Sequence, residues 1–322
     1  MASLLSVENL QVQFQTKKGI NTAVDGVSFS VEKGRILGIV GESGCGKSVT
    51  SMSILQLLGS NARISGGSIK LDGKELIGLP EKEMCRIRGN DIAMIFQDPM
   101  TALNPTLTIG TQLMEPIMLH QNCGKKEAWT RAVDVLKRVG IAAPEKRMKE
   151  YPHQLSGGMR QRVMIAMAVS CEPRLLIADE PTTALDVTIQ AQILELMCEL
   201  REKMGTAIVL ITHDMGVVAE TADDVLVLYA GKAVEYGSIE DIFERPKHPY
   251  TQGLLNSIPR LDEDVELLNT IEGTVPAPDA MPAGCRFAPR CPYGKDRCMK
   301  EKPGVYHAGN SLVSCFRYEG EK

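Results

Sequence analysis

The eight residues from Gly41 to Ser48 constrain the fold of this chain more than any other stretch. They read GESGCGKS, which fits the pattern G-x-x-x-x-G-K-[ST]. Positions 35–40 before them are short, apolar and β-branched, and positions 49–58 after them can form a helix. A strand, a glycine-rich loop and a helix in this order predict a phosphate-binding loop. A glycine-rich turn that binds nothing is the alternative, and a full match in this context disfavours it.

The predicted loop would bind a nucleoside triphosphate through its backbone and two side chains. Glycines let the N–H groups face the phosphates, and the start of the helix adds the positive end of its dipole. Lys47 would reach the β- and γ-phosphates, while the Ser48 hydroxyl would hold Mg²⁺. The expected nucleotide contacts in and beside the loop are Gly41, Ser43, Gly44, Cys45, Gly46, Lys47, Ser48 and Val49.

Composition indicates a folded protein of ordinary globular type. The chain has 322 residues, of which 43% are hydrophobic and 24% charged. No apolar run approaches the roughly 18 residues of a membrane span, and the first residues lack the layout of a secretory signal. We therefore expect a soluble protein that stays in the cytosol. Its nine cysteines are then not expected to form disulfides.

Alternating apolar and polar residues predict an antiparallel β layer around the loop. The alternation covers positions 4–14 and 23–31, and an Asp72-Gly73 turn joins positions 68–71 to 74–76. Phe14 lies where an aromatic ring could stack on a purine base. An inward-facing position on a strand is an equally good interpretation of Phe14.

Three further strands are predicted to end in polar side chains. Positions 92–96 deliver Gln97 to the carboxyl end of a strand, where ligands gather in open α/β sheets. Positions 175–178 lead into Asp179 and Glu180, an arrangement that places one acid on Mg²⁺ and the next beside an attacking water. Positions 207–212 end at His213. Together with the loop, these strands predict an α/β core.

Between these strands, positions 98–171 show helical spacing and no strand pattern. Apolar residues recur at 129, 132, 133, 136 and 139, and Gly140 then takes the position that follows a helix. The segment closes with LSGGMRQR, in which Ser156 is predicted to cap a helix that begins at Gly157 and Gly158. These patterns predict a helical subdomain inserted into the core.

The motifs, in this order, resemble those of the ATP-binding subunit of an ABC transporter. The resemblance covers roughly residues 4–245. It rests on positions 41–48 as Walker A, Gln97 as Q-loop, 155–159 as signature, Asp179-Glu180 as Walker B, Asp186 as D-loop and His213 as H-loop. Positions 97–105, 248–251 and 285–292 further resemble the oligopeptide/dipeptide importer ATPases and their C-terminal extension. Cys45 departs from the serine or alanine of many relatives, and its side chain is expected to point away from the phosphates.

The resemblance implies an architecture and a mechanism. It implies a P-loop core with an antiparallel β layer (1–97 and 172–245), a helical signature subdomain (98–171) and a small Cys-rich extension (246–322). Two such chains would face head to tail and bury two ATP molecules. Ser156, Gly157, Gly158 and Asp186 would act on the ATP held by the other chain. Glu180 would polarise the attacking water, and His213 would contact the γ-phosphate. Mg²⁺ would be bound through Ser48, Gln97 and Asp179.

The resemblance also implies partners and a location. They are a second ATPase subunit, identical or paralogous, two membrane permease subunits and an external peptide-binding protein, with the chain peripheral on the cytoplasmic face of the membrane. Import of another solute, such as nickel, is the alternative. A soluble ABC protein of translation or repair is disfavoured, because the chain has one motif set and no sustained heptads. A metal-containing redox or nucleic-acid switch built on the tail remains as an addition to this function and not as a replacement for it, because eight Lys and Arg against four Asp and Glu from position 285 onward give only about +4.

Four cysteines in this tail predict a metal site. Cys285, Cys291, Cys298 and Cys315 form C-x5-C-x6-C-x16-C on a polar segment with too few apolar residues for its own core. Structural zinc sites favour pairs two to four residues apart, which are absent, so the spacing favours a [4Fe–4S] cluster, with zinc or four free buried thiols as alternatives. We expect a structural staple. Its loss should leave ATP binding at Lys47 largely intact, because the two regions are expected to fold separately.

Overall fold

The computed structural model describes residues 3–17, 19–183, 186–258 and 270–320. The chain forms two compact units. One comprises Met1–Leu4, Val31–Arg35 and Gly78–Ile211, and the other comprises Leu5–Ser30, Ile36–Ile77 and Thr212–Lys322. The phosphate-loop motif and the cysteine-rich tail belong to the same unit.

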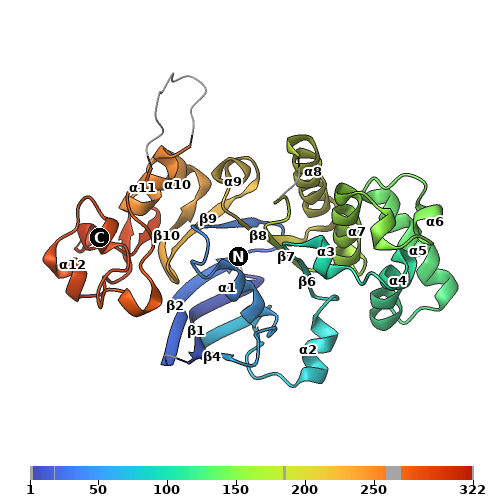
Figure 1. Ribbon diagram of the computed structural model, residues 1–322, viewed down its shortest axis with the longest axis horizontal. Helices are drawn as coiled ribbons and strands as arrows, with labels where there is room; N and C mark the ends of the chain where they lie inside the picture. The colour runs from blue at the N-terminus through green and yellow to red at the C-terminus, as the bar shows by residue number, and fades with distance from the viewer. Residues whose placement is uncertain (1–2, 18, 184–185, 259–269, 321–322) are drawn as a thin grey trace. The chain divides into compact units, whose positions relative to one another are not determined.

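The unit that holds the loop contains the predicted antiparallel β layer. Its strands lie in the order β2-β1-β4-β5, of which Figure 1 labels β2, β1 and β4. Their bounds are β1 Leu5–Thr16, β2 Gly19–Val31, β4 Ala62–Leu71 and β5 Lys74–Glu75. Asp72 and Gly73 both have positive φ (51° and 78°), as a two-residue hairpin turn with the twist of the strands requires. The β layer predicted from the alternation is therefore confirmed, while Lys18, which separates β1 from β2 in the sequence, lies outside the described residues.

A second set of strands in this unit carries the loop. They lie in the order β11-β12-β10-β9-β3, with β3 parallel to β9 and the other pairs antiparallel. Their bounds are β3 Ile36–Val40, β9 Asp224–Tyr229, β10 Lys232–Ser238, β11 Tyr306–Ala308 and β12 Ser311–Val313. All five residues of β3 are buried, as its apolar sequence predicts. The helices are α1 Lys47–Ile54, α9 Met215–Thr221, α10 Ile239–Glu244, α11 Pro249–Asn256 and α12 Asp296–Lys300, with short 3₁₀ turns at Pro278–Ala280, Ala288–Arg290 and Phe316–Tyr318.

The C-terminal extension packs into the core of this unit instead of relying on a core of its own. Phe287 is 2% exposed. Its ring centroid lies 5.1 Å from that of Tyr229 on β9, which lies outside the extension, and 5.4 Å from that of Tyr250 on α11, which belongs to the extension itself. The pairing of β12 with β10 adds backbone hydrogen bonds between the extension and the sheet that contains β3, β9 and β10. Counting the apolar residues of the extension alone therefore underestimated what holds it.

A cluster of three cations around one carboxylate forms a second anchor for the extension. Asp25 on β2 lies 3.1–3.3 Å from Lys302 and Arg286 of the extension and from Lys232 of β10. Burial opposes the charge of Asp25, but hydrogen bonds and charges of Lys302 and Lys232 outweigh it and lower the pKa of the carboxyl. The extension is thus joined to the β layer by ion pairs and to β10 by strand pairing.

The other unit combines three parallel strands with most of the helices. Strands β6 Ile92–Ile95, β7 Leu175–Asp179 and β8 Ala207–Thr212 lie in the order β8-β7-β6, and every residue in them is buried. Figure 1 shows α4 to α7 gathered together in green. The helices are α2 Glu81–Ile87, α3 Pro99–Ala102, α4 Ile109–His120, α5 Lys125–Arg138, α6 Pro144–Arg147, α7 Gly157–Val169 and α8 Val187–Met204, with a 3₁₀ turn at Pro152–Gln154. The helical segment expected at positions 98–171 is present.

Local signals set the ends of these helices as predicted. Gly140 follows α5 with φ 73°, and the N–H of Ile141 bonds to the carbonyl of Leu136. Ser156 caps α7, since its Oγ accepts from the N–H of Met159 at 3.4 Å. Among the residues that the structure describes, none of the helices is both long and apolar enough to span a bilayer.

Candidate nucleotide-binding site

The loop between β3 and α1 adopts a conformation that only glycine accommodates easily. Gly41, Gly44 and Gly46 have φ of 153°, 77° and 101°, in the range that L side chains rarely adopt. A Cβ added at Gly41 would lie 2.1 Å from the carbonyl oxygen of Leu228, which is backbone and cannot swing away. The glycines therefore let the loop wrap closely, which is the geometry that phosphate binding requires.

Lys47 supplies the one positive side chain of the loop. It is 5% exposed, and its Nζ donates to the carbonyl oxygens of Gly41 at 2.7 Å and Glu42 at 3.2 Å. No described side chain caps α1, so the first-turn N–H groups of this helix are available to an anion. A buried cation beside free N–H groups favours a bound phosphate chain.

The remaining predicted contacts of the loop divide between its exposed and buried faces. Ser43, Gly44 and Ser48 are exposed, and Val49 is half-buried on α1. Cys45 is buried, and its burial raises the pKa of the thiol, so it stays neutral and away from the exposed face. Phe14 is half-buried on β1 opposite Ala62 of β4.

Two residues of the C-terminal part hold the loop at Glu42, and sequence reasoning missed both. The N–H of Glu42 donates to Tyr250 Oη at 3.0 Å. Its carboxylate accepts from Arg290 Nη1 at 2.8 and 3.1 Å. These contacts join positions 208 and 248 residues apart, which no local pattern reveals.

In the other unit, the structure brings Gln97 and Glu180 together at the ends of parallel strands. Asp179 is the buried last residue of β7, and Glu180 follows it with φ 47°. Glu180 Oε2 accepts from Gln97 Nε2 at 2.9 Å and from Thr183 Oγ1 at 2.9 Å. Two donors thus orient one carboxylate oxygen, and Thr183 was not anticipated although it follows Glu180 by three residues.

The residues expected to act on a neighbouring chain lie near the starts of two helices in this unit. Ser156 and Gly157 are exposed, and a Cβ on Gly158 would lie 3.4 Å from Ile189 of α8. Asp186 caps α8, because its Oδ1 accepts from the N–H of Ile189 at 2.9 Å. The two predicted motifs therefore meet where α7 approaches α8.

His213 follows β8 and is exposed. It lies on the chain immediately after the strand whose end was predicted to face ligand. It belongs to the unit that carries the loop.

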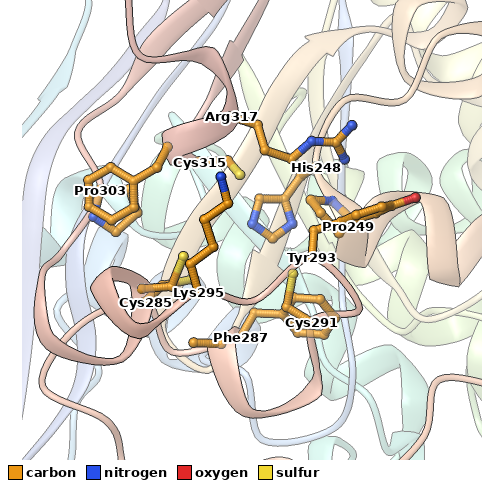
Figure 2. Close-up of a pocket in the computed structure, with 13 residues that line it drawn as sticks. His248, Pro249, Cys285, Phe287, Cys291, Tyr293, Lys295, Pro303, Cys315 and Arg317 are labelled. Carbon is orange, nitrogen blue, oxygen red and sulfur yellow. The ribbon is translucent and has the colours of Figure 1, made fainter.

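The four tail cysteines surround one cavity of about 70 Å³. Cys285, Cys291, Cys298 and Cys315 all line it together with His248, and Figure 2 shows three of them around the same hollow. Burial raises the pKa of the Cys285 thiol to about 11 and also raises the pKa values of Cys291 and Cys315.

These thiols do not converge on one point as the ligands of a metal ion would. Across the described ranges, no group of three or more His, Cys, Asp or Glu side chains is arranged to hold a metal ion. The [4Fe–4S] cluster predicted from the cysteine spacing is therefore not supported by the side-chain positions, and neither is the zinc alternative. Four cysteine side chains that line one cavity are what the structure contains.

Comparison with known protein families assigns both parts of the chain. A family described as "ABC transporter" matches residues 24–183. A second, described as "Oligopeptide/dipeptide transporter, C-terminal region", matches residues 234–298. The two matches cover the loop, the acid pair, the signature and the first part of the extension.

Relatives match over nearly the whole chain. The oligopeptide transport ATP-binding protein AppD of Bacillus subtilis is 56% identical over 323 residues, which cover 100% of this chain and 98% of that protein. OppD of Escherichia coli is 52% identical and covers 98% of this chain and 93% of its own length. The dipeptide transport ATP-binding protein DppD of B. subtilis is 54% identical, with 98% and 95% covered.

Solved structures agree on the fold. The dimeric post-hydrolysis state of the ATP-binding cassette MJ0796, bound to ADP and Pi, superposes with a TM-score of 0.66 at 28% identity and covers 73% of this chain and 98% of the cassette. The cbiO1 protein of Clostridium perfringens, part of an ABC transporter complex, gives 0.64 at 27% identity, with 76% and 92% covered. The chain belongs to the ABC transporter family of ATPases, among the ATP-binding proteins of oligopeptide and dipeptide transport.

Proposed function

We propose that this chain binds and hydrolyses ATP to power the import of dipeptides or oligopeptides through a membrane ABC transporter. The observation that carries the peptide assignment is the match of residues 234–298 to the C-terminal region of such transporters. ABC transporter ATPases in general share the loop, acid pair and signature, so those motifs alone support only the ATPase. The relatives named as peptide transport proteins support the same assignment over the whole chain.

The chemistry follows from the two sets of side chains. The loop N–H groups and Lys47 would bind the triphosphate. Mg²⁺ would be bound through Ser48, Gln97 and Asp179. The Glu180 carboxylate, oriented by two hydrogen-bond donors, would accept a proton from the attacking water. His213 would contact the γ-phosphate. Loss of that phosphate would reverse the closure that drives the transporter.

Catalysis on this scheme needs a second cassette. Ser156 and Gly157 are exposed at the start of α7, so the Ser156 O–H and the Gly157 N–H could donate to ATP held by another chain. Asp186 would lie at the same interface. The second cassette would be a paralogue or a second copy, and the assembly would include two permease subunits and an external peptide-binding protein. The chain would then sit peripherally at the cytoplasmic face of the membrane.

The helical segment would receive the permease. It exposes several large apolar side chains in the described part of positions 98–171, namely Leu107, Met118, Leu119 and Tyr151. Such side chains are typical of protein-binding surfaces. The segment starts directly after Gln97, so closure around Mg²⁺ would be transmitted into it. Cysteine placed at Ala102 should crosslink to a permease, and no crosslink in any nucleotide state would argue against docking there.

Glu180→Gln tests the ATPase mechanism. The amide preserves shape and an acceptor oxygen for Gln97 and Thr183, but it cannot take a proton. Turnover of ATP–Mg²⁺ should fall by about 10²- to 10⁴-fold, while ATP affinity stays near that of the wild type. Size exclusion should then show a dimer that persists with ATP. Undiminished phosphate release without an ATP-dependent dimer would refute the assignment.

Uptake in cells tests the substrate. A strain that lacks this gene should fail to accumulate a radiolabelled tripeptide, and the wild-type gene, but not the Glu180→Gln variant, should restore uptake. Normal tripeptide uptake with lost ⁶³Ni²⁺ uptake would instead identify the nickel alternative.

We also propose that the four tail cysteines hold a [4Fe–4S] cluster, with a zinc ion as the alternative. Support comes from the spacing of the four cysteines in the sequence and from the single cavity that all four line. In a cluster each iron takes one cysteine, so the sulfurs stand further apart than four sulfurs at about 2.3 Å from one zinc. When bound, the cluster would crosslink four points of the extension.

Metal analysis after anaerobic purification tests this site. A cluster should absorb light at about 400 nm, and assays should find iron and sulfide. A colourless protein with one zinc per chain would favour zinc. A protein that contains neither iron nor zinc would refute the metal site. Serine at Cys291 should lower the metal content.

A further inference from the structure

Arg290 is a nearly buried cation whose hydrogen bonds lead to the phosphate-binding loop. Its side chain is 6% exposed, and Nη1 donates to both carboxylate oxygens of Glu42, at 2.8 and 3.1 Å. The same nitrogen lies 3.4 Å from Tyr229 Oη. Burial disfavours the charge, but the bonds to Tyr229 and Glu42 outweigh it and raise the pKa of the guanidinium. This arginine is therefore a permanent positive charge placed on the loop.

Glu42 is the one acidic residue in the loop GESGCGKS. Three side chains contact it: Arg290 at the carboxylate, Tyr250 Oη at the N–H and Lys47 Nζ at the carbonyl. Its side chain is 30% exposed, so water screens it only in part. An unpaired carboxylate at this position would repel a triphosphate bound on the same loop, and Arg290 cancels that charge.

We propose that Arg290 and Tyr250 are positioning residues of the ATP-binding loop. Arg290 neutralises and orients the Glu42 carboxylate, and Tyr250 holds the Glu42 peptide, so that the remaining N–H groups of the loop face the phosphates. Both act through Glu42 and neither touches ATP. The inference rests on the proposed binding of ATP by this loop. It gives the C-terminal extension a part in nucleotide binding.

A purely structural role for Arg290 makes different predictions. Arg290 also donates to the carbonyl oxygens of Ile271 and Glu272, at 3.1 and 2.9 Å, so it anchors this stretch of chain as well. Loss of that anchor would lower stability whatever residue stands at position 42. Loss of charge neutralisation would instead disappear when the carboxylate is removed.

The test is calorimetric titration of the full chain with ATP–Mg²⁺. Arg290→Gln should weaken ATP binding about tenfold at low salt, and the defect should shrink at high salt because ions screen the repulsion. Adding Glu42→Gln to Arg290→Gln should restore affinity to within about threefold of the wild type without restoring thermal stability. The matched control is Arg297→Gln. Arg297 also directly precedes a tail cysteine but pairs with Glu301 and Glu319 inside the extension, so ATP binding should not change.

Each outcome separates this inference from the proposed function. Failure of the wild-type chain to bind ATP would overturn the proposed function itself. Wild-type affinity in Arg290→Gln, or a defect that Glu42→Gln does not relieve, would overturn the inference alone. Should Arg290→Gln not fold, Tyr250→Phe takes its place, because the ring stays and only the hydroxyl that accepts from Glu42 is lost. It should weaken ATP binding about threefold to fivefold, and unchanged affinity would again overturn the inference.

Discussion

Replacing Phe287 with alanine should detach the C-terminal extension from its unit. The ring is buried between Tyr229 and Tyr250 and lies 5.7 Å from His248, so its loss removes a full aromatic side chain and three ring contacts. Truncation of a buried phenylalanine costs about 3–5 kcal/mol. That cost is a large share of the stability of a typical domain, about 5–15 kcal/mol. We expect the extension to open before the rest of the chain unfolds.

Urea denaturation followed by two signals measures this effect. Trp129, the only tryptophan, lies on α5 in the other unit, so its fluorescence follows a part of the chain that does not contain Phe287. The near-ultraviolet circular dichroism of the tyrosines follows mainly the unit of the cluster, because six of the seven tyrosines belong to that unit. Phe287→Ala should shift the tyrosine transition to lower urea and the tryptophan transition much less. Tyr293→Ala, at an exposed position in the same extension, should cost less than about 1 kcal/mol. Equal costs for the two variants would refute the argument that the aromatic cluster holds the extension.

Three further predictions concern single side chains. Thr183→Val should lower kcat about threefold to tenfold and leave KM for ATP nearly unchanged, since Glu180 loses the hydroxyl donor of Thr183; unchanged phosphate release would contradict this. Asp25→Asn should cost about 2 kcal/mol at pH 7, because three cations lose their carboxylate. As the pKa of Asp25 is lowered in the folded chain, this contribution is present above pH 4 and is lost as the pH falls below it, so urea curves at pH 3 should show a smaller difference between variant and wild type. Gly41→Ala should abolish ATP binding and lower the melting temperature more than Gly44→Ala, whose Cβ would meet no atom within 4 Å; equal melting temperatures would contradict the predicted clash.

Features that depend on neighbours in sequence were predictable. The strand before the loop, the glycines of the loop, the cap at Ser156 and the glycine after α5 each depend on a few consecutive residues. The helix after the loop was predicted at positions 49–58 but runs from Lys47 to Ile54, because helix ends depend on the fit to surrounding structure as well as on propensity.

Features that depend on distant contacts were not predictable. Tyr250 and Arg290 carry no motif that would point to Glu42, and only the folded chain brings them together. The expectation that loss of the cysteine site leaves ATP binding intact assumed that the two regions fold separately. Arg290 directly precedes Cys291 and contacts the loop, which removes the physical basis of that expectation. Thr183 is different: a hydroxyl three residues after the second acid is a local signal that could have been recognised.

The contact between Glu42 and Arg290 also bears on how the protein is made. The two residues are 248 positions apart. A ribosome adds about 5–20 residues per second, so the loop emerges roughly 12–50 seconds before the arginine that pairs with it. Once His213 has been added, the nascent chain carries every nucleotide motif, yet the acid of its loop lacks its counter-charge until Arg290 follows. ATP affinity should therefore mature late in synthesis, which delays nucleotide capture by unfinished chains.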